Sequence, residues 1–272
     1  MKTLELLLSQ NRPLVMGILN TTPDSFSDGG KFLKQGDAIK QIERMLKCGA
    51  DIIDIGGEST RPGAAEVPEQ EEIERVMPLV EAANKMGAVV SVDTSKASVM
   101  KEALAQGVEL INDVRALQEE GAIEVVANSR AHVCLMHMQG SPRTMQQNPT
   151  YEDVTNEVKD MLRQRIAVCT KHGIEAKRII IDPGFGFGKT LQHNCQLMHL
   201  LDELKELECP ILVGVSRKRM IGDILDREVD DRIIGSVVAA AYAAQKGAKI
   251  LRVHDVDETV QAIKIVQAFE KQ

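Results

Sequence analysis

Arg252 and His254 have the types and the spacing of an anion-binding pair. They stand two positions apart in the apolar run "KILRVHDV", so on a β-strand their side chains would project to the same side. A guanidinium and an imidazole that converge on one point can bind phosphate oxygens. The other interpretation is that Arg252 pairs with Asp255 or with another carboxylate.

A second candidate is "IDPGFGFGKT", Ile181 to Thr190, which ends in Gly-Lys-Thr like a phosphate-binding P-loop. A P-loop needs a glycine five residues before Gly188, and Pro183 stands there. The dinucleotide fingerprint also fails, because it would need a glycine where Lys189 stands. The apolar run before Asp182 instead predicts a strand that delivers this carboxylate into a site, unless Asp182 only serves the turn.

Lys218 follows another apolar run, within "SRKRMIG". A lysine at a strand end can form a Schiff base if its pKa is lowered, and the neighbouring Arg217 and Arg219 could help to lower it. A lysine that only donates hydrogen bonds needs no lowered pKa. We prefer this second role for Lys218.

The elements that must position these residues follow a regular pattern. Longer amphipathic segments follow apolar, β-branched runs; in residues 69–87, for example, Ile73, Met77, Val80 and Ala83 share one helix face. Several such segments end at a glycine, as helices often do: Gly49, Gly87, Gly107, Gly173 and Gly247. The eight apolar runs begin at Leu14, Asp51, Ala88, Glu109, Ala131, Arg178, Pro210 and Ala248.

Eight strand-helix units predict an α/β fold. The runs are too uniformly apolar to have a solvent-exposed face, so we expect a parallel sheet covered by helices. In a chain of 272 residues the economical closure is a single-domain (β/α)8 TIM barrel. The alternative is a doubly wound open sheet. No linker divides residues 1–272, which we expect to form one domain after a lead-in at residues 1–12.

Polar residues recur where the predicted strands end, and barrel enzymes carry their working residues there. Any one of them has a simpler explanation; Asp93, for instance, could cap the next helix. Capping is a weak explanation for so many. Two long loops, residues 20–36 and 56–70, are predicted lids, unless they are plain surface excursions. The strand ends carry Asn20, the loop from Gly56, Asp93, Asn112, His137, Asp182, Ser216 with Lys218, and Arg252 with His254.

Composition narrows the function classes. The net charge of −7 argues against non-specific binding to nucleic acid or membrane surfaces. The five cysteines are an odd number without a Cys-x-x-Cys pair, so we expect neither a disulfide framework nor a structural zinc site. No apolar segment is long enough to span a bilayer. We expect a cytoplasmic protein.

Taken in order, eight motifs closely resemble the dihydropteroate synthases, the folate-pathway enzymes that sulfonamide drugs target. The resemblance extends from about Pro13 to the end of the chain. It implies a monofunctional transferase that condenses 6-hydroxymethyl-7,8-dihydropterin diphosphate with p-aminobenzoate, giving 7,8-dihydropteroate and diphosphate through a dissociative, SN1-like step. The motifs are "GILNTTPDSFSDGG", "DIGGESTRPGA", "SVDTSK", "INDV", "MHMQG", "IDPGFGFGKT", "SRKRMIG" and "RVHDV".

The resemblance also implies roles for individual residues. Asp28, Arg61 and Lys218 are expected to be catalytic, and Asn20 is expected to hold Mg2+ together with the diphosphate. Lys218 also belongs to the expected pterin contacts, with Asp93, Asn112 and Asp182. Arg252, His254 and Asn20 are expected to bind the diphosphate. The remaining expected substrate contacts, mostly for p-aminobenzoate, are Phe26, Ser59, Thr60, Pro62, Phe187, Gly214 and Ser216.

Three other functions stay open at this point. One is a corrinoid-dependent methyltransferase that uses methyltetrahydrofolate on the same barrel; another is a pterin-binding paralogue without turnover. A Schiff-base aldolase would rest on Lys218 alone. The family is usually dimeric, and the apolar run "IIGSVVAAAYAA" from Ile233 could serve an interface or face the barrel.

Overall fold

The computed structural model describes residues 2–21, 31–59, 66–141 and 144–270. Five predicted site residues lie outside these ranges: Phe26, Asp28, Thr60, Arg61 and Pro62. The strands of the described residues are β1 (Leu14–Asn20), β2 (Ile52–Gly56), β3 (Val89–Asp93), β4 (Leu110–Asp113), β5 (His132–Met136), β6 (Ile179–Asp182), β7 (Leu212–Val213) and β8 (Ile250–Val253).

Helices alternate with these strands along the chain. Short 3-10 turns, η2 (Ala176–Arg178), η3 (Leu201–Leu207) and η4 (Val229–Asp231), lie between some of them. The α-helices are α1 (Leu4–Leu8), α2 (Lys31–Lys47), α3 (Glu69–Lys85), α4 (Ala97–Ala105), α5 (Ala122–Ala127), α6 (Val154–Lys171), α7 (Leu191–His199), α8 (Arg219–Leu225), α9 (Ile233–Gln245) and α10 (Val256–Glu270).

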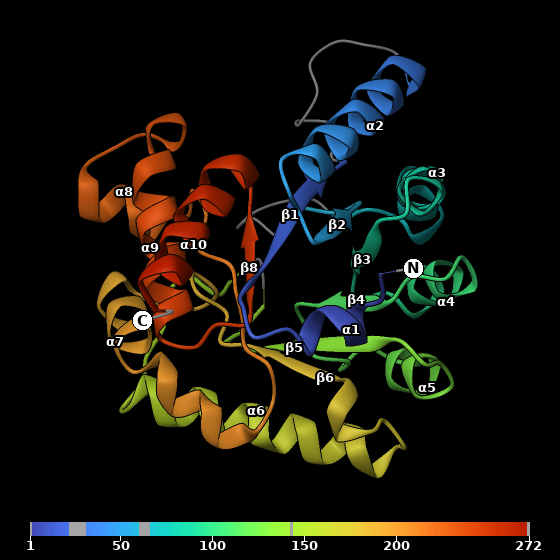
Figure 1. Cartoon of the computed structure of the whole chain (residues 1–272). Coiled ribbons are helices and arrows are strands. Elements are labelled where there is room, and N and C mark those ends of the chain that lie inside the picture. The colour runs from blue at the N-terminus through green and yellow to red at the C-terminus, as the bar shows by residue number, and fades with distance from the viewer. Residues whose placement is uncertain (1, 22–30, 60–65, 142–143, 271–272) are drawn as a thin grey trace.

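The strands form one parallel sheet that closes on itself. The order β6-β5-β4-β3-β2-β1-β8-β7 ends in two edge strands, and a parallel bridge between Ile181 and Ile211 joins those edges. Helices surround the strands (Figure 1). The predicted TIM barrel is therefore confirmed, and the open-sheet alternative is wrong.

Side chains alternate between the barrel interior and the helices. Leu14, Ile52 and Ile250 belong to an inner cluster, whereas their neighbours Val15, Ile53 and Leu251 belong to a second cluster shared with helix residues. Such alternation is inherent to a strand. It separates the barrel filling from the layer that packs the helices, and it decides which strand residues can reach a site inside the barrel.

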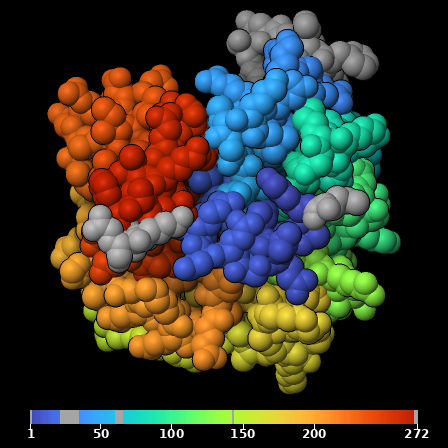
Figure 2. All heavy atoms as spheres, viewed as in Figure 1, coloured from blue at the N-terminus to red at the C-terminus, as the bar shows by residue number. Residues whose placement is uncertain are grey.

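Helix α1 closes the amino-terminal end of the barrel. Leu4 and Leu7 are fully buried and pack in the inner cluster with Leu14. The backbone N–H of Leu4 also donates to Glu109 Oε2 at 2.7 Å. In Figure 2 the N-terminal residues, dark blue, lie in the middle of the visible face, between the C-terminal helix and the helices of the first half. The lead-in predicted for residues 1–12 is thus a plug.

The predicted helix ends are also confirmed. Gly49, Gly87, Gly107, Gly173 and Gly247 all have positive φ, the conformation that a helix C-terminus often requires and glycine adopts without strain. The five cysteines are all free. Within the described ranges, no helix combines the length and the apolar character that crossing a membrane requires.

Candidate active site

A polar layer lies inside the barrel, one step above its apolar filling. Each of its members stands two residues after a member of the inner cluster, so both project inward. Register pairs these strands side by side, for example Asp54 with Ser91 and Asp93 with Asn112. The layer consists of Asp54, Ser91, Asn112, Asp182 and Arg252. It lies toward the carboxyl ends of the strands, where the sequence predicted the site.

Arg252 connects Asp54, a member of this layer, with Asp93, which ends β3 two residues after Ser91. Its Nε donates to Asp54 Oδ2 at 2.6 Å and its Nη2 donates to Asp93 Oδ2 at 2.7 Å. Asp54, whose side chain is inaccessible to solvent, also accepts from Ser91 Oγ at 2.6 Å and from Asn112 Nδ2 at 3.2 Å. Three strands are thereby joined to β8 through one buried carboxylate.

Burial and charge act against each other in this network. Burial raises the pKa of Asp93 to about 7; Arg252 opposes that shift, while Asp54 adds to it. Burial alone would lower the pKa of Arg252, but Asp54 and Asp93 outweigh it and raise that pKa. Arg252 is therefore a permanent cation, and Asp93 is the group whose charge responds to what binds beside it.

Asp182 and Lys218 form a second group with the loop after β6. Asp182 Oδ1 accepts from the backbone N–H of Gly184 at 2.7 Å, so the turn role weighed for it is real but uses one oxygen only. Lys218 Nζ donates to the Phe185 carbonyl oxygen at 2.5 Å and lies 4.5 Å from the centre of the Phe187 ring. This lysine is thus a hydrogen-bond donor and a cation–π partner.

The pKa of Asp182 is raised and the pKa of Lys218 is lowered. Burial raises the pKa of Asp182, and Lys218 opposes the rise. Burial also lowers the pKa of Lys218 to about 8, with Arg252 adding to the effect and Asp182 opposing it. Arg217, which was weighed as a possible cause of this lowering, instead pairs with Asp255, and Arg252 is the cation that contributes.

The structure also bears on two alternatives weighed for the strand-end residues. Arg252 holds the carboxylates of Asp54 and Asp93, as the competing interpretation had it, and Ser216 Oγ lies 3.1 Å from His254 Nδ1. Asp255 is not the partner of Arg252. Asp93 does not cap a helix, because the N-cap residue of α4 is Lys96 and Asp93 binds Arg252.

The remaining predicted residues border the same end of the barrel where the structure describes them. Asn20 ends β1, and its Oδ1 lies 3.8 Å from the point where a Cβ on Gly56 would stand. Gly214 follows β7, with room for Arg252 beside it: an added Cβ would be 3.7 Å from Arg252 Cβ. Ser59 follows β2 and is half-buried.

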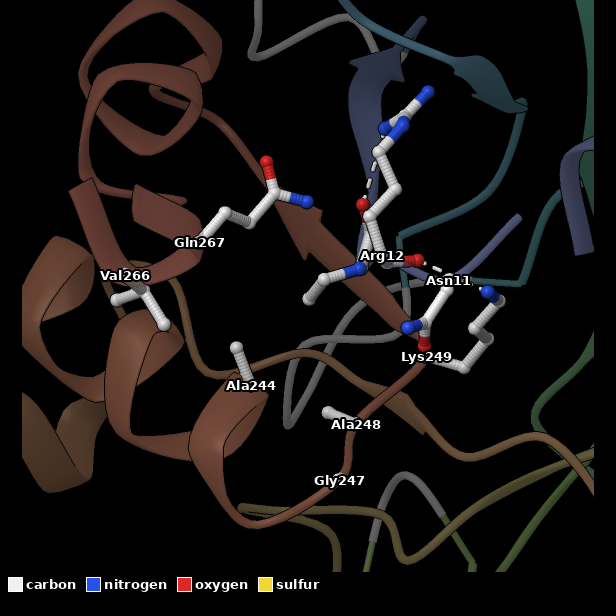
Figure 3. Close-up of a pocket in the computed structure, with 9 residues that line it drawn as sticks. Asn11, Arg12, Ala244, Gly247, Ala248, Lys249, Val266 and Gln267 are labelled. Carbon is white, nitrogen blue, oxygen red and sulfur yellow. Dashed lines mark hydrogen bonds between the residues drawn. The ribbon is translucent and has the colours of Figure 1, made fainter. Parts of the chain in front are cut away.

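A basic hollow away from this site holds its cations for a structural purpose. Arg12 and Lys249 line a pocket at the amino end of the barrel, between the start of β8 and helices α9 and α10 (Figure 3). Arg12 pairs with both oxygens of Asp51, at 2.8 and 2.6 Å, and Lys249 Nζ donates to the carbonyl oxygens of Gln10 and Arg12. Both cations therefore bind groups of the protein itself and fix the N-terminal segment to the barrel.

Sequence reasoning missed Asp54 and Ser91 as members of the site. The signal was available, since an aspartate inside "DIIDIG" shares the inward parity of Ile52 and Gly56. Lys189 and His137 were noticed, but their contact, 2.9 Å between Nζ and Nδ1, was not expected. A contact between two loops 52 residues apart leaves no local pattern in the sequence.

Known proteins with the same features define the class. A family model described as "Pterin binding enzyme" matches residues 16–254, which contain every strand of the barrel except the first two residues of β1. A barrel whose strand ends carry paired carboxylates, an amide and a lysine suits a ring with several hydrogen-bonding groups. The fold and the site thus define a pterin-binding enzyme.

Relatives in that class are more specific. The dihydropteroate synthase of Haemophilus influenzae is 56% identical over 257 residues, 94% of each chain. A Yersinia pestis dihydropteroate synthase crystallised with a sulfonamide drug is 53% identical, covers 97% of this chain and 96% of its own, and superposes with a TM-score of 0.92. A Xanthomonas albilineans enzyme with 4-aminobenzoic acid is 48% identical with a TM-score of 0.91, covering 96% and 94%. The chain belongs to the dihydropteroate synthases.

Proposed function

We propose that this protein condenses 6-hydroxymethyl-7,8-dihydropterin diphosphate with p-aminobenzoate to give 7,8-dihydropteroate and diphosphate. The observation that carries the proposal is the gathering of Asn112, Asp182 and Arg252 of the polar layer with Asp93 and Lys218 at the strand ends, in a chain that belongs to the dihydropteroate synthases. A related Xanthomonas albilineans enzyme was crystallised with 7,8-dihydropteroate, the expected product. The same relationship supports sulfonamides as inhibitors.

The pterin ring suits the donors and acceptors that the layer leaves open. Asp182 keeps one carboxylate oxygen free of the turn bond, and a carboxylate can accept from adjacent N–H groups such as the 2-amino group and N3. Lys218 uses one of its three N–H donors on Phe185 and can direct the others to O4 and N5. Asp93 and Asn112 complete the contacts, and a wrong ring would leave these buried groups unpaired.

Arg252 can hold the diphosphate without leaving its carboxylates. Its bonds to Asp54 and Asp93 use two N–H groups of a guanidinium that has five. The others are available to phosphate oxygens, with His254 two residues further along β8. Charge that develops on the leaving group as its C–O bond breaks would be stabilised by these donors.

The residues present fit a magnesium ion held mainly by the substrate. Asn20 offers an amide oxygen at the end of β1, a ligand type that Mg2+ accepts. Groups of three carboxylate, histidine or cysteine side chains that could hold a metal are absent from the described residues, which suits an ion carried in by phosphate oxygens. A bound ion would offset the charge on the departing diphosphate. Activity should disappear with EDTA and return with excess Mg2+.

The nucleophile needs little help from the protein. The amine of p-aminobenzoate is neutral near pH 7 and already has a free lone pair, so no strong base is required. The pterin methylene must instead carry positive charge as diphosphate leaves, and this favours a dissociative step. The Phe187 ring, 4.5 Å from Lys218 Nζ, is a proposed p-aminobenzoate contact, together with Ser216 and Gly214, which precede Lys218 in the same segment after β7.

Phe26, Asp28, Thr60, Arg61 and Pro62 complete the proposed site from the two loops outside the described residues. We assign Asp28 to stabilise the cationic pterin and Arg61 to the same step. Ser59, Thr60 and Pro62 would hold p-aminobenzoate with Phe26. An Asp28→Ala variant should bind pterin diphosphate and lose turnover; full turnover in that variant would remove Asp28 from the mechanism.

A two-substrate assay tests the function as a whole. Diphosphate release would be followed with and without p-aminobenzoate, in Mg2+, with mass detection of dihydropteroate. Product that requires both substrates supports the synthase. Pterin binding without product would favour the non-catalytic paralogue, and methyl transfer from methyltetrahydrofolate to a corrinoid would favour the methyltransferase. The aldolase would be revealed by borohydride trapping of Lys218 with a carbonyl compound.

A homodimer through α9 and α10 is part of the proposal. Ile234, Val238 and Tyr242 recur every four residues on α9 and are 80%, 62% and 40% exposed, while Ser236 and Ala240 face inward. The two helices lie side by side (Figure 1), and α10 adds the exposed Phe269. A stripe of this kind is typical of an interface. Ile234→Glu with Val238→Glu should give monomers in analytical ultracentrifugation.

We further propose a cytoplasmic, single-domain enzyme. Five free cysteines fit a reducing compartment, and the proposed substrates are small molecules, with no role for nucleic acid or membrane. Fluorescence of a tagged protein in fractionated cells would test the compartment. Limited proteolysis that yields one stable core would support the single domain.

A further inference from the structure

Lys189 is a buried amine that the proposed reaction does not use. Lys189 is only 3% exposed. Its Nζ has three partners: His137 Nδ1 at 2.9 Å, the Gly184 carbonyl oxygen at 2.9 Å and the Phe187 carbonyl oxygen at 3.1 Å. An ammonium group has three N–H donors and each can find an acceptor here. The lysine of this Gly-Lys-Thr sequence is therefore fully engaged inside the protein and does not extend toward a phosphate.

The loop that Lys189 binds has no freedom to pack differently. Gly184, Gly186 and Gly188 all have positive φ. A Cβ on Gly184 would lie 1.9 Å from the His137 carbonyl oxygen, and one on Gly188 would lie 2.5 Å from that of Gln139. The loop after β6 thus lies against the segment after β5, and the ammonium group of Lys189 bonds both segments at their contact.

This loop carries three groups of the proposed pterin site. The N–H of Gly184 binds Asp182 Oδ1 at 2.7 Å, the carbonyl oxygen of Phe185 accepts from Lys218 at 2.5 Å, and the Phe187 ring lies 4.5 Å from Lys218 Nζ. Lys189 is bonded to Gly184, just before Phe185, and to Phe187, two residues after it. A change at Lys189 would therefore move the partners of both Asp182 and Lys218.

We propose that Lys189 is a positioning residue for pterin recognition: its ammonium group fixes the Pro183–Phe187 loop so that Asp182 and Lys218 are presented to the ring. This inference rests on the proposed function for the identity of the ligand. It assigns the conspicuous lysine of "IDPGFGFGKT" a role inside the loop. His137 takes part as a neutral acceptor through Nδ1, with its proton on Nε2.

Electrostatics supports the same role. Burial lowers the pKa of His137 to about 3, with Lys189 adding to the effect, so this ring is neutral and can accept. Burial lowers the pKa of Lys189 to about 7, and Asp182 opposes that shift. Three cations lower the pKa of Asp182: Lys218 beyond β7, Arg252 on β8 and Lys189 in the loop. Asp182 in turn raises the pKa of Cys134 on β5. Lys189 thus acts with Lys218 and Arg252 to oppose the rise in the pKa of Asp182.

The test compares binding in four proteins and a control. The dissociation constant of 6-hydroxymethyl-7,8-dihydropterin would be measured by calorimetry for the wild type, Lys189→Met, Lys218→Met and the double variant. Lys177→Met is the matched control, because Lys177 precedes β6 at its other end and its side chain is 69% exposed. Circular dichroism and melting temperatures establish that each protein is folded.

Lys189→Met should weaken pterin binding by about tenfold or more, since it removes charge-assisted bonds from the loop. The loss in the double variant should be smaller than the product of the single losses, because both residues act through one loop. The acid limb of binding should move to higher pH, as Asp182 loses a neighbouring cation. Lys177→Met should change none of these.

Several results would overturn the proposal. Wild-type affinity in Lys189→Met would do so, as would multiplicative losses in the double variant with an unmoved acid limb, which is the pattern of a purely structural lysine. If the methionine variant does not fold, Lys189→Arg keeps the charge and should keep the acid limb, whereas Lys189→Gln should shift it. A wild type that binds pterin but forms no dihydropteroate would refute the proposed function and leave this test intact.

Discussion

Asp54→Asn should lower pterin affinity as well as thermal stability, because Asp54 orients two residues of the proposed pterin site. Asp54 is inaccessible to solvent and accepts hydrogen bonds from Ser91, Asn112 and Arg252. The substitution keeps the shape and one acceptor, but it removes the charge opposite Arg252. Asn112 and Arg252 then lose the group that orients them from below, although Asp54 is not itself one of the proposed substrate contacts.

The size of the effect follows from burial. Breaking a buried ion pair costs about 3–5 kcal/mol, and the lower end applies here because Arg252 keeps Asp93 at 2.7 Å. At roughly 2–4 °C per kcal/mol for a chain of this size, the melting temperature should fall by about 6–12 °C. A lost hydrogen bond to a charged group is worth about 1.5–3 kcal/mol, so pterin affinity should fall by about 10- to 100-fold.

Asp51→Asn is the matched control. Asp51 precedes the same strand at the opposite end of the barrel, is buried, and pairs with Arg12 through both carboxylate oxygens. Its loss should lower the melting temperature and leave pterin affinity unchanged. Calorimetric titration with the dihydropterin and thermal unfolding would be run on both variants. Wild-type pterin affinity in Asp54→Asn, or an equal loss in the two variants, would refute the reasoning.

Three further predictions concern the plug, the loop and the pH dependence. Leu7→Ala should destabilise the protein by about 2–5 kcal/mol in urea unfolding, because Leu7 is buried in the barrel filling, and the folded variant should keep its turnover. Gly184→Ala should lose pterin binding, since its Cβ would meet the His137 carbonyl oxygen, whereas Gly87→Ala, also at positive φ but with open space, should lose only about 1–3 kcal/mol of stability. Pterin affinity of the free enzyme should decrease above about pH 8, where Lys218 with its lowered pKa loses its proton, and also toward acid pH, where Asp182 gains one. A flat titration curve would contradict the last of these.

The architecture could be predicted because it repeats. Eight apolar runs, the helical spacing between them and the glycines at helix ends are local signals. The structure has a strand at each run, helices between the strands and positive φ at each of these glycines. The plug formed by α1 was missed for the opposite reason. Only five residues long, it is stabilised by burying Leu4 and Leu7 in a barrel that strands far along the chain must first close.

The site could be predicted as a set of residues but not as a set of bonds. The carboxyl ends of all the strands lie at one end of a parallel barrel, so Asp93, Asn112 and Asp182 were expected to gather there. Sequence spacing cannot tell which cation serves which carboxylate, because Arg252 reaches Asp54 across 198 positions and Arg217 takes Asp255 instead. The role of Lys189 is hidden in the same way, since its histidine partner belongs to another loop.

Charge balance among the described residues supports the divalent ion that we propose for the leaving group. When all are ionised, the carboxylates of Asp54, Asp93 and Asp182 face the cations Arg252, Lys218 and Lys189, so the six groups are neutral together. A diphosphate ester adds several negative charges to a site that has no surplus of cations. Donors on Arg252 and His254 can orient it, but they cannot neutralise it. A divalent ion held by Asn20 and the phosphate oxygens would offset that charge, so diphosphate affinity should depend on Mg2+ far more steeply than pterin affinity does.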